Sequence, residues 1–290
     1  MRFDEQLVAY TRRKVLRVAQ KMRNRKSAAL SSLLMALLIA TAGPRSWAQT
    51  DTALAKQLAN PIANLISVPL QFNYDEGYGE LDGDRSFLNV QPVIPFELNE
   101  DWIVISRTIL PLISQSDVVP GGGSQNGLGD ALQSFFFSPK ASGGTTWGVG
   151  PAIQLPTATD DALASEQWAA GPTAVVLKQI GPWTVGALAN HLWGFAEEDG
   201  REAINSSFFQ PFVTYVTPKA TTYYLNLESG YDWERDEAGV PVNFGVNQLF
   251  KTKGGQRYQV GGGLRYWLED RDAGPSGWGL RINFVLLFPT

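Results

Sequence analysis

The sequence predicts an all-β protein, a transmembrane antiparallel up-and-down β-barrel of about 12 strands. Three observations lead to this prediction. Apolar and polar residues alternate with a period of two in many segments, these segments have the length of a bilayer-crossing strand, and the links between them alternate between long and short. The composition agrees with an all-β chain, because the 290 residues include 29 Gly, 9 Trp, 9 Tyr and 15 Phe and only 18% are charged.

The first 48 residues predict a secretory signal peptide. An apolar run, residues 27–42 (SAALSSLLMALLIATA), follows a basic stretch and precedes Ser46-Trp47-Ala48, after which cleavage is expected. The run is shorter than the ~20 residues of a membrane-spanning helix, so an uncleaved anchor is the weaker alternative. The start codon is open between Met1 and Met22, since a start at Met22 would give a signal of ordinary length.

Residues 49–65 are expected to form a short N-terminal periplasmic segment, and residues 66–290 the barrel. Residues 51–65 (DTALAKQLANPIANL) predict a short amphipathic helical stretch that Pro61 breaks. The sequence leaves open whether this stretch plugs the lumen.

The balance of charge and the scarcity of His and Cys exclude several classes of function. The chain has 24 basic and 28 acidic side chains, and residues 1–48 hold ten of the basic and two of the acidic ones. The other residues therefore carry 14 basic against 26 acidic side chains, which argues against a nucleic-acid partner held by a basic face. One His and no Cys exclude a multi-histidine or thiolate metal site. No metal and no cofactor are expected.

Alternation begins at residues 66–74 (ISVPLQFNY), which predict a strand with one apolar face, and it is clearest at residues 278–288 (WGLRINFVLLF). Outer-membrane barrels need an even number of antiparallel strands of ~9–11 residues. Residues 129–138 and 167–179 alternate poorly, so the count is twelve plus or minus two. The predicted strands are 66–74, 85–97, 102–112, 129–138, 145–156, 167–179, 183–194, 206–216, 222–231, 240–250, 256–268 and 278–288.

The links between these segments differ in length and in charge. The long links (75–84, 113–128, 157–166, 195–205, 232–239 and 269–277) hold twenty acidic residues and only three basic ones, Arg201, Arg235 and Arg271. The short links are 98–101, 139–144, 180–182, 217–221 and 251–255. A barrel has short periplasmic turns and longer outside loops, so its two ends face different compartments, whereas a soluble sandwich has little reason to separate charge by end.

The polar face of the strands predicts the lining of the lumen. Most of its members are amides, which suit small polar or uncharged solutes. Arg265 and Arg281 lie on adjacent strands, where they either form a positive spot paired with Glu228 or hold the interior together. The predicted lumen-lining residues are Gln71, Asn73, Asn89, Gln91, Gln210, Asn226, Glu228, Asn243, Asn247, Gln259, Arg265, Arg281 and Asn283.

Candidate chemistry outside the lumen is limited. His191 is the only imidazole, and the serines that could pair with it (Ser206, Ser207 and Ser229) lack a G-x-S-x-G elbow. Because a serine nucleophile needs a base that is oriented by a third group, we assign no catalytic residue. The acidic links lack the spacing of an EF-hand and are interpreted as a solvated rim, with a divalent cation shared with lipopolysaccharide as the alternative.

Several motifs together resemble a known family. They are Gly127-Leu128-Gly129-Asp130, Phe137-Ser138-Pro139, Gly148-Val149-Gly150-Pro151, residues 154–160 (QLPTATD), residues 168–174 (WAAGPTA), Gly181-Pro182-Trp183, residues 189–193 (ANHLW) and residues 286–289 (LLFP). The chain resembles the outer-membrane transporter family named for the MetA pathway of phenol degradation, some members of which are labelled neuromedin-U-like. The resemblance implies an outer-membrane β-barrel, uptake of hydrophobic or aromatic compounds, and no catalytic residues.

We therefore expect a monomeric barrel in the outer membrane of a Gram-negative bacterium. Its expected function is that of a passive channel for small solutes, with aromatic or hydrophobic solutes implied by the resemblance. Two alternatives stay open, a barrel-type lipid or ester hydrolase that uses His191 and a structural or adhesive surface barrel. The expected partners are outer-membrane lipid and lipopolysaccharide, the solute and the barrel assembly machinery, and no nucleic acid. The identity of the solute and the direction of flow are not determined by the sequence.

Overall fold

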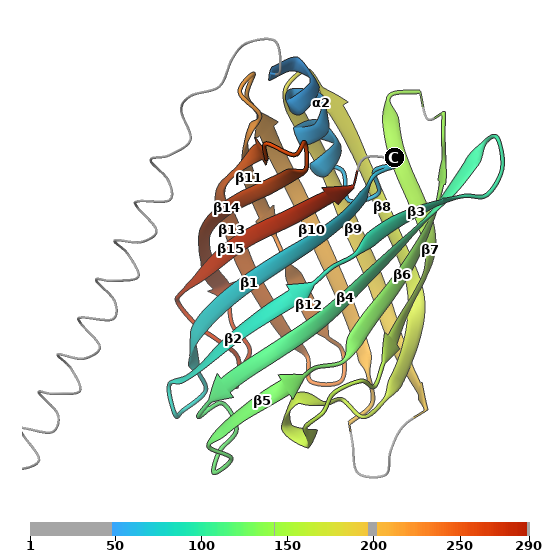
Figure 1. Cartoon of the computed structure of the whole chain (residues 1–290). Coiled ribbons are helices and arrows are strands. Elements are labelled where there is room, and N and C mark those ends of the chain that lie inside the picture. The colour runs from blue at the N-terminus through green and yellow to red at the C-terminus, as the bar shows by residue number, and fades with distance from the viewer. Residues whose placement is uncertain (1–47, 142, 197–201, 289–290) are drawn as a thin grey trace, which may run out of the picture. The chain divides into compact units, whose positions relative to one another are not determined.

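The computed structural model of the chain describes residues 48–141, 143–196 and 202–288 (Figure 1). The predicted signal peptide lies outside the described residues up to position 47. One helix, α2 (Ala48–Leu58), precedes the strands, and Asp160 caps a single 3₁₀ turn at Asp161–Leu163. No helix in the described part of the chain is long and apolar enough to cross a membrane.

The strands form one closed antiparallel sheet. Each barrel strand, three of which are divided into two pieces, pairs with the barrel strand before it and the one after it, β9 pairs β10, and β1 pairs β15 from Ile66↔Phe288 to Tyr74↔Leu280. This is the up-and-down barrel that the alternation predicts. The strands are β1 (Ile66–Tyr78), β2 (Gly83–Val90), β3 (Val93–Glu97), β4 (Trp102–Ser116), β5 (Ser124–Leu128), β6 (Ala131–Pro139), β7 (Thr145–Leu155), β8 (Trp168–Ile180), β9 (Trp183–Ala196), β10 (Asn205–Val216), β11 (Thr221–Leu227), β12 (Ser229–Asp232), β13 (Glu237–Lys251), β14 (Arg257–Glu269) and β15 (Trp278–Phe288).

These fifteen pieces make a barrel of 12 strands, which confirms the predicted count. Three barrel strands are interrupted, β2/β3 at Gln91-Pro92, β5/β6 at Gly129-Asp130 and β11/β12 at Glu228. Pro92 has no N–H to give to a ladder, which accounts for the first break. At the second break the Asp130 carboxylate accepts hydrogen bonds from the N–H groups of Ala158 (3.1 Å) and Ser165 (2.7 Å) and so holds the loop after β7.

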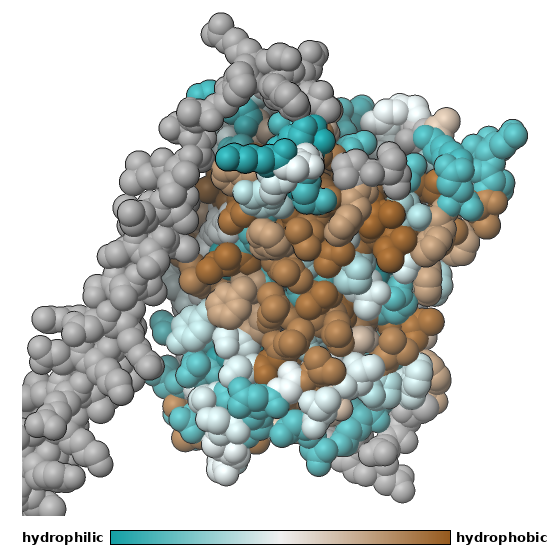
Figure 2. Space-filling view, viewed as in Figure 1, coloured by the Kyte–Doolittle hydropathy of each residue, from teal (hydrophilic) through white to brown (hydrophobic). Residues whose placement is uncertain are grey.

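The outer wall of the barrel is apolar. Figure 2 shows a brown hydrophobic band across the middle of the visible face and teal hydrophilic residues toward both ends. Large exposed apolar side chains occur around the ring, on strands from β4 to β15, and include Leu112, Phe137, Val176, Phe209, Phe244 and Ile282. An apolar belt between two polar ends is the surface that a bilayer requires.

The two ends of the barrel differ. Short turns lie at the end where α2 and the C-terminal strand end are found, and the long loops lie at the other (Figure 1). Several strands run farther toward the long-loop end than the sequence predicts. β1 continues to Tyr78, with Asp75 opposite Arg85 and Glu76 opposite Asp84. The prediction that Asp75 lies in a link is therefore wrong, because the ladder continues past the apolar part of the strand.

Candidate functional site

Helix α2 and the turn after it occupy the short-turn end of the barrel. Leu54, Ala55, Ala63 and Leu65 are buried in one cluster with apolar side chains of the barrel wall, among them Leu287. The helix ends before Pro61, which cannot continue it. The N-terminal segment therefore packs into this end of the barrel.

Polar contacts fix α2 to the wall. The Arg257 Nε donates to Asp51 Oδ1 at 2.9 Å, and the Thr52 hydroxyl donates to the carbonyl of Pro218 at 3.0 Å. The Gln179 amide donates to the carbonyl of Lys56 at 2.8 Å. Three different parts of the wall thus hold one short helix, and we call residues 49–65 the plug segment.

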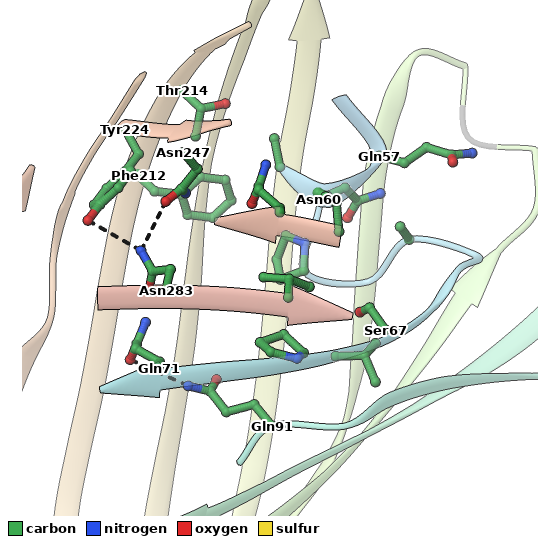
Figure 3. Close-up of a pocket in the computed structure, with 18 of the residues that line it drawn as sticks. Gln57, Asn60, Ser67, Gln71, Gln91, Phe212, Thr214, Tyr224, Asn247 and Asn283 are labelled. Carbon is green, nitrogen blue, oxygen red and sulfur yellow. Dashed lines mark hydrogen bonds between the residues drawn. The ribbon is translucent and has the colours of Figure 1, made fainter. Parts of the chain in front are cut away.

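An inner chamber of about 240 Å³ lies beside this plug (Figure 3). Gln57 and Asn60 of the plug segment line one side of it, and Gln71, Asn247 and Asn283 line the wall. The Asn283 amide donates to Asn247 Oδ1 at 3.2 Å and to the Tyr224 hydroxyl at 3.4 Å. The chamber is rich in amides, each of which can both donate and accept a hydrogen bond.

A layer of charged side chains lies beyond the inner chamber. Arg281 donates to both carboxylate oxygens of Glu228, at 2.7 and 2.8 Å, and Arg265 Nε lies 3.4 Å from Asp75 Oδ1. Asn73 Oδ1 accepts a hydrogen bond from each arginine, at 2.9 Å from Arg265 and 2.7 Å from Arg281. The side chains of Asp75, Arg265 and Arg281 are at most 5% exposed, whereas that of Glu228 is 18% exposed. We call these five residues the charged layer.

An outer chamber of about 730 Å³ lies on the long-loop side of the charged layer. Asp75, Glu228 and Arg265 line it, together with the aromatic side chains of Tyr78, Phe87, Phe208 and Trp267. The Arg265 guanidinium lies over the rings of Phe87 and Trp267, 5.8 and 5.4 Å from their centroids. Trp267 Nε1 also donates to Asp75 Oδ1 at 3.3 Å. This chamber therefore presents aromatic surface directly above the charged layer.

The interior is polar on one side and apolar on the other. Strands β11 to β15, with β1, supply the charged layer and many of the amides. The strands from β6 to β9 supply buried apolar side chains, such as Phe136, Leu177 and Leu188, and Ile62 of the plug segment packs in the same cluster. A solute in this lumen contacts hydrocarbon on one side and hydrogen-bonding groups on the other.

Eleven of the thirteen residues predicted to line the lumen line one of the two chambers. Asn73 and Asn243 are fully buried, and Asn243 donates to Asn226 Oδ1 at 2.9 Å. Those at the outer chamber are Asn89, Glu228 and Arg265. Those at the inner chamber are Gln71, Gln91, Gln210, Asn226, Asn247, Gln259, Arg281 and Asn283.

Sequence reasoning missed several interior charges, among them Asp75 and Arg107. Arg107 lines the inner chamber and donates to Gln91 Oε1 at 3.0 Å. It lies in residues 105–110 (ISRTIL), in which both faces of the strand carry apolar residues. Alternation therefore does not show which face of the strand Arg107 occupies. The available signal is a lone arginine in the middle of a strand that has no other charged residue.

His191 lies away from the lumen. It shares the outward face of β9 with Trp183 and Trp193, and its Nδ1 lies 2.8 Å from Ser207 Oγ on β10. The Ser207 oxygen also accepts a hydrogen bond from Trp233 Nε1 at 2.9 Å. His191 Nε2 is buried and has no hydrogen-bond partner within the part of the chain that the structure describes. The pair thus lacks the third group that would orient a catalytic imidazole.

The acidic loops form hydrogen bonds among themselves. Arg235 Nε donates to Glu202 Oε2 at 2.7 Å, and this hydrogen bond raises the pKa of the Arg235 guanidinium. Asn205 donates to Glu234 at 3.0 Å. Among residues 48–141, 143–196 and 202–288, no group of three or more His, Cys, Asp and Glu side chains could hold a metal ion.

Comparison with solved structures shows that the chain shares its fold with a known outer membrane protein. The chain is similar to an outer membrane channel from Pseudomonas putida F1, with a TM-score of 0.62 and 15% identity over 77% of this chain and 96% of that chain. Weaker likenesses, both with a TM-score of 0.45, are to the outer membrane phospholipase dimer of Salmonella typhi (10% identity, 81% of this chain and 98% of that chain) and to the CymD monoaromatic hydrocarbon channel (9% identity, 86% and 94%). No curated protein matches the sequence.

A family model matches most of the barrel. Its description reads "Putative MetA-pathway of phenol degradation", and it matches residues 79–284. The match confirms the resemblance carried by the sequence motifs. With its closed strand ring and apolar belt, the protein is a β-barrel of the Gram-negative outer membrane. The chain therefore belongs to the protein family that is named for the MetA pathway of phenol degradation.

Proposed function

We propose that the protein is a passive channel for small solutes, with single-ring aromatic compounds as the main class. The observation that carries this proposal is the arrangement of two chambers in series inside a closed barrel, one of about 730 Å³ and one of about 240 Å³. The outer chamber has four aromatic side chains at its wall, which suit a flat ring. The family description, which names phenol degradation, supports the same class.

The mechanism is diffusion along the boundary between the two sides of the lumen. A solute enters the outer chamber from the long-loop end, and its ring packs on Phe87, Phe208 and Trp267. It passes the charged layer on the side of the apolar strands, because the Glu228–Arg281 pair occupies the polar side. It then reaches the amides of the inner chamber and leaves past α2. The described residues suggest no energy-coupling device, so flow follows the concentration gradient.

Planar bilayers test the channel directly. Purified protein should give small, stable conductance steps, because a 12-stranded barrel with a plug segment and a filled apolar side leaves a narrow path. A strain that lacks the protein should also grow more slowly on a low concentration of an aromatic carbon source. Flat current traces over a range of salt concentrations would contradict the channel, and unchanged growth would favour a structural or adhesive barrel.

An ester or lipid hydrolase is the second candidate, favoured by one contact. His191 Nδ1 and Ser207 Oγ are 2.8 Å apart on the outward face of the barrel, where a lipid ester could reach them. Against it, the Ser207 oxygen already accepts a hydrogen bond from Trp233, and His191 Nε2 has no orienting partner among the described residues. We therefore expect no hydrolysis of short-chain or phospholipid esters. Activity that disappears in His191→Ala and in Ser207→Ala would reverse this assignment.

The remaining features of the proposal concern the mature form and its surroundings. We propose cleavage of the signal peptide after Ala48 and insertion of a monomer by the barrel assembly machinery. Lipid contacts the apolar belt, and lipopolysaccharide contacts the acidic loop end. N-terminal sequencing of the purified protein tests the cleavage site, and its mass in detergent tests the monomer.

A further inference from the structure

The charges that line the inner chamber are all positive. Its described lining includes many amides and two ionisable charged side chains, Arg107 and Arg281, and no carboxylate. The Arg281 guanidinium already has an acidic partner, because it donates hydrogen bonds to both oxygens of Glu228 and also to Asn73. Arg107 is the cation that faces this chamber without an acidic partner.

The surroundings of Arg107 support this description. Its Nη2 donates to the neutral Gln91 Oε1 at 3.0 Å, and it forms no ion pair with any carboxylate among the described residues. Glu228 is the acidic group that acts on it electrostatically, and Glu228 is already bonded to Arg281 and lies 3.8 Å from Arg265. The charged layer and the inner chamber together hold three guanidinium groups, of Arg107, Arg265 and Arg281, and two carboxylates, of Asp75 and Glu228, so they carry one excess positive charge.

An unpaired guanidinium inside a barrel is costly unless water or an anion compensates it. The inner chamber supplies room for such an anion next to Arg107. The Gln71 amide and the Tyr224 hydroxyl lie around the same space and can donate further hydrogen bonds (Figure 3). The Gln210 amide, which donates one hydrogen bond to Glu228 at 3.4 Å, also lines this space. A planar carboxylate matches the fork of a guanidinium better than a spherical ion does.

Apolar groups complete the chamber. Phe212, Val93 and Pro61 lie among its lining residues, so part of the wall suits hydrocarbon. The volume of about 240 Å³ is below the ~300–1,000 Å³ typical of sites for drug-sized ligands, so the occupant is small.

We propose that Arg107 and the surrounding amides form an anion site in the inner chamber, which takes a small carboxylic acid, such as a single-ring aromatic carboxylate, during passage. This inference rests on the proposed channel function and refines its solute class. The aromatic ring packs against the apolar side, and the carboxylate replaces the acidic partner that Arg107 lacks. Neutral aromatic compounds then use the same path without a preferred stop.

Calorimetric titration of the purified full barrel in detergent tests the site. The probes are benzoate, the neutral benzamide of similar shape, and chloride. Benzoate should bind at least ~10-fold more tightly than benzamide or chloride, since hydrogen bonds to charged groups are worth more than neutral ones. Equal affinity for benzoate and chloride would overturn the carboxylate assignment, and equal affinity for benzoate and benzamide would overturn the anion site.

Four variants locate the effect. Arg107→Gln should weaken benzoate binding about 10-fold, while Arg107→Lys, which keeps the charge, should retain most of it. Gln91→Glu keeps Arg107 and places a carboxylate on its present partner, so it should also weaken benzoate binding. Lys253→Gln removes a positive charge from an exposed short turn at the same end of the barrel and should change nothing. Migration of the unheated protein in SDS gels verifies that each variant is folded.

Conductance separates the two proposals. If the wild-type protein conducts potassium chloride but benzoate binding is absent or survives in Arg107→Gln and Gln91→Glu, the channel stands and the anion site is refuted. If benzoate binds in an Arg107-dependent way but no current is seen, the site stands and the channel is refuted.

Discussion

Replacing Glu228 by glutamine should destabilise the barrel far more than the loss of an ordinary surface charge. Arg281 donates to both oxygens of this carboxylate, and its side chain is only 2% exposed, so it cannot turn toward solvent when the charge is removed. Removal of one partner of a buried ion pair typically costs ~3–5 kcal/mol. We expect about 3 kcal/mol for Glu228→Gln, the lower end of that range, because Glu228 is 18% exposed and glutamine keeps one acceptor.

The assay is urea unfolding of the protein folded into lipid vesicles, followed by gel migration and tryptophan fluorescence and extrapolated linearly to water. Glu97→Gln is the matched control. Glu97 and Lys140 form an ion pair of 3.4 Å with exposed side chains, 76% and 30%, and such pairs contribute ~1 kcal/mol or less. The double variant Glu228→Gln/Arg281→Gln should lose less than the sum of its two single variants, because it also removes the Arg281 guanidinium that Glu228→Gln leaves unpaired. Equal free energies of unfolding for Glu228→Gln and Glu97→Gln would refute this reasoning.

Three further predictions concern the interior and the wall. Deletion of residues 49–60 should raise single-channel conductance about twofold or more, because the plug segment lines the inner chamber, and unchanged current steps would show that α2 does not obstruct the path. Asn73→Ala should lower the free energy of unfolding by ~1.5–3 kcal/mol, since Asn73 Oδ1 accepts hydrogen bonds from two guanidinium groups, and a value near zero in the same urea assay would contradict that role. Gly171→Ala should prevent stable folding, because a Cβ there would lie 1.9 Å from the His191 carbonyl oxygen. Gly254→Ala should fold normally, because a Cβ there would lie 3.8 Å from its nearest neighbouring atom. Equal yields of heat-modifiable protein from the two variants would contradict the steric argument.

The strands could be predicted because the bilayer imposes a two-residue period on them. β15, Trp278–Phe288, has the bounds that its alternation predicts, and β9, Trp183–Ala196, differs by two residues at one end. Residues 129–138 alternate weakly because both faces of this strand carry apolar side chains, with Phe136 buried inside and Phe137 exposed on the wall. The same barrel strand is interrupted at Gly129-Asp130, where the Asp130 carboxylate binds the loop after β7. Local loop contacts of this kind leave no periodic signal.

The interior was less predictable than the wall. Polarity alone assigns Asn73 or Asn283 to the inward face, since amides are costly on a lipid-facing wall. It cannot show that Asn73 bridges two arginines, because Arg265 and Arg281 are about 200 positions away in the sequence. The sequence predicts a link at Asp75 because Asp75 follows the last apolar residue of its segment. In the structure the strand continues, with Asp75 opposite Arg85, and the Asp75 carboxylate lies 3.4 Å from Arg265. The division into two chambers depends on such cross-barrel contacts.

The charged layer links the stability of this barrel to the width of its path. A 12-stranded barrel encloses more space than its wall side chains can fill with hydrocarbon alone, and here α2 and the Glu228–Arg281 pair occupy part of what is left. Each group that narrows the lumen also holds strands together across it, since Arg281 of β15 reaches Glu228 between β11 and β12. Changes that widen the path by removing these groups must therefore weaken the fold. Conductance and resistance to urea should consequently change in opposite directions when plug and charged-layer variants are compared, and a variant that raises both would show that permeation follows a route other than this lumen.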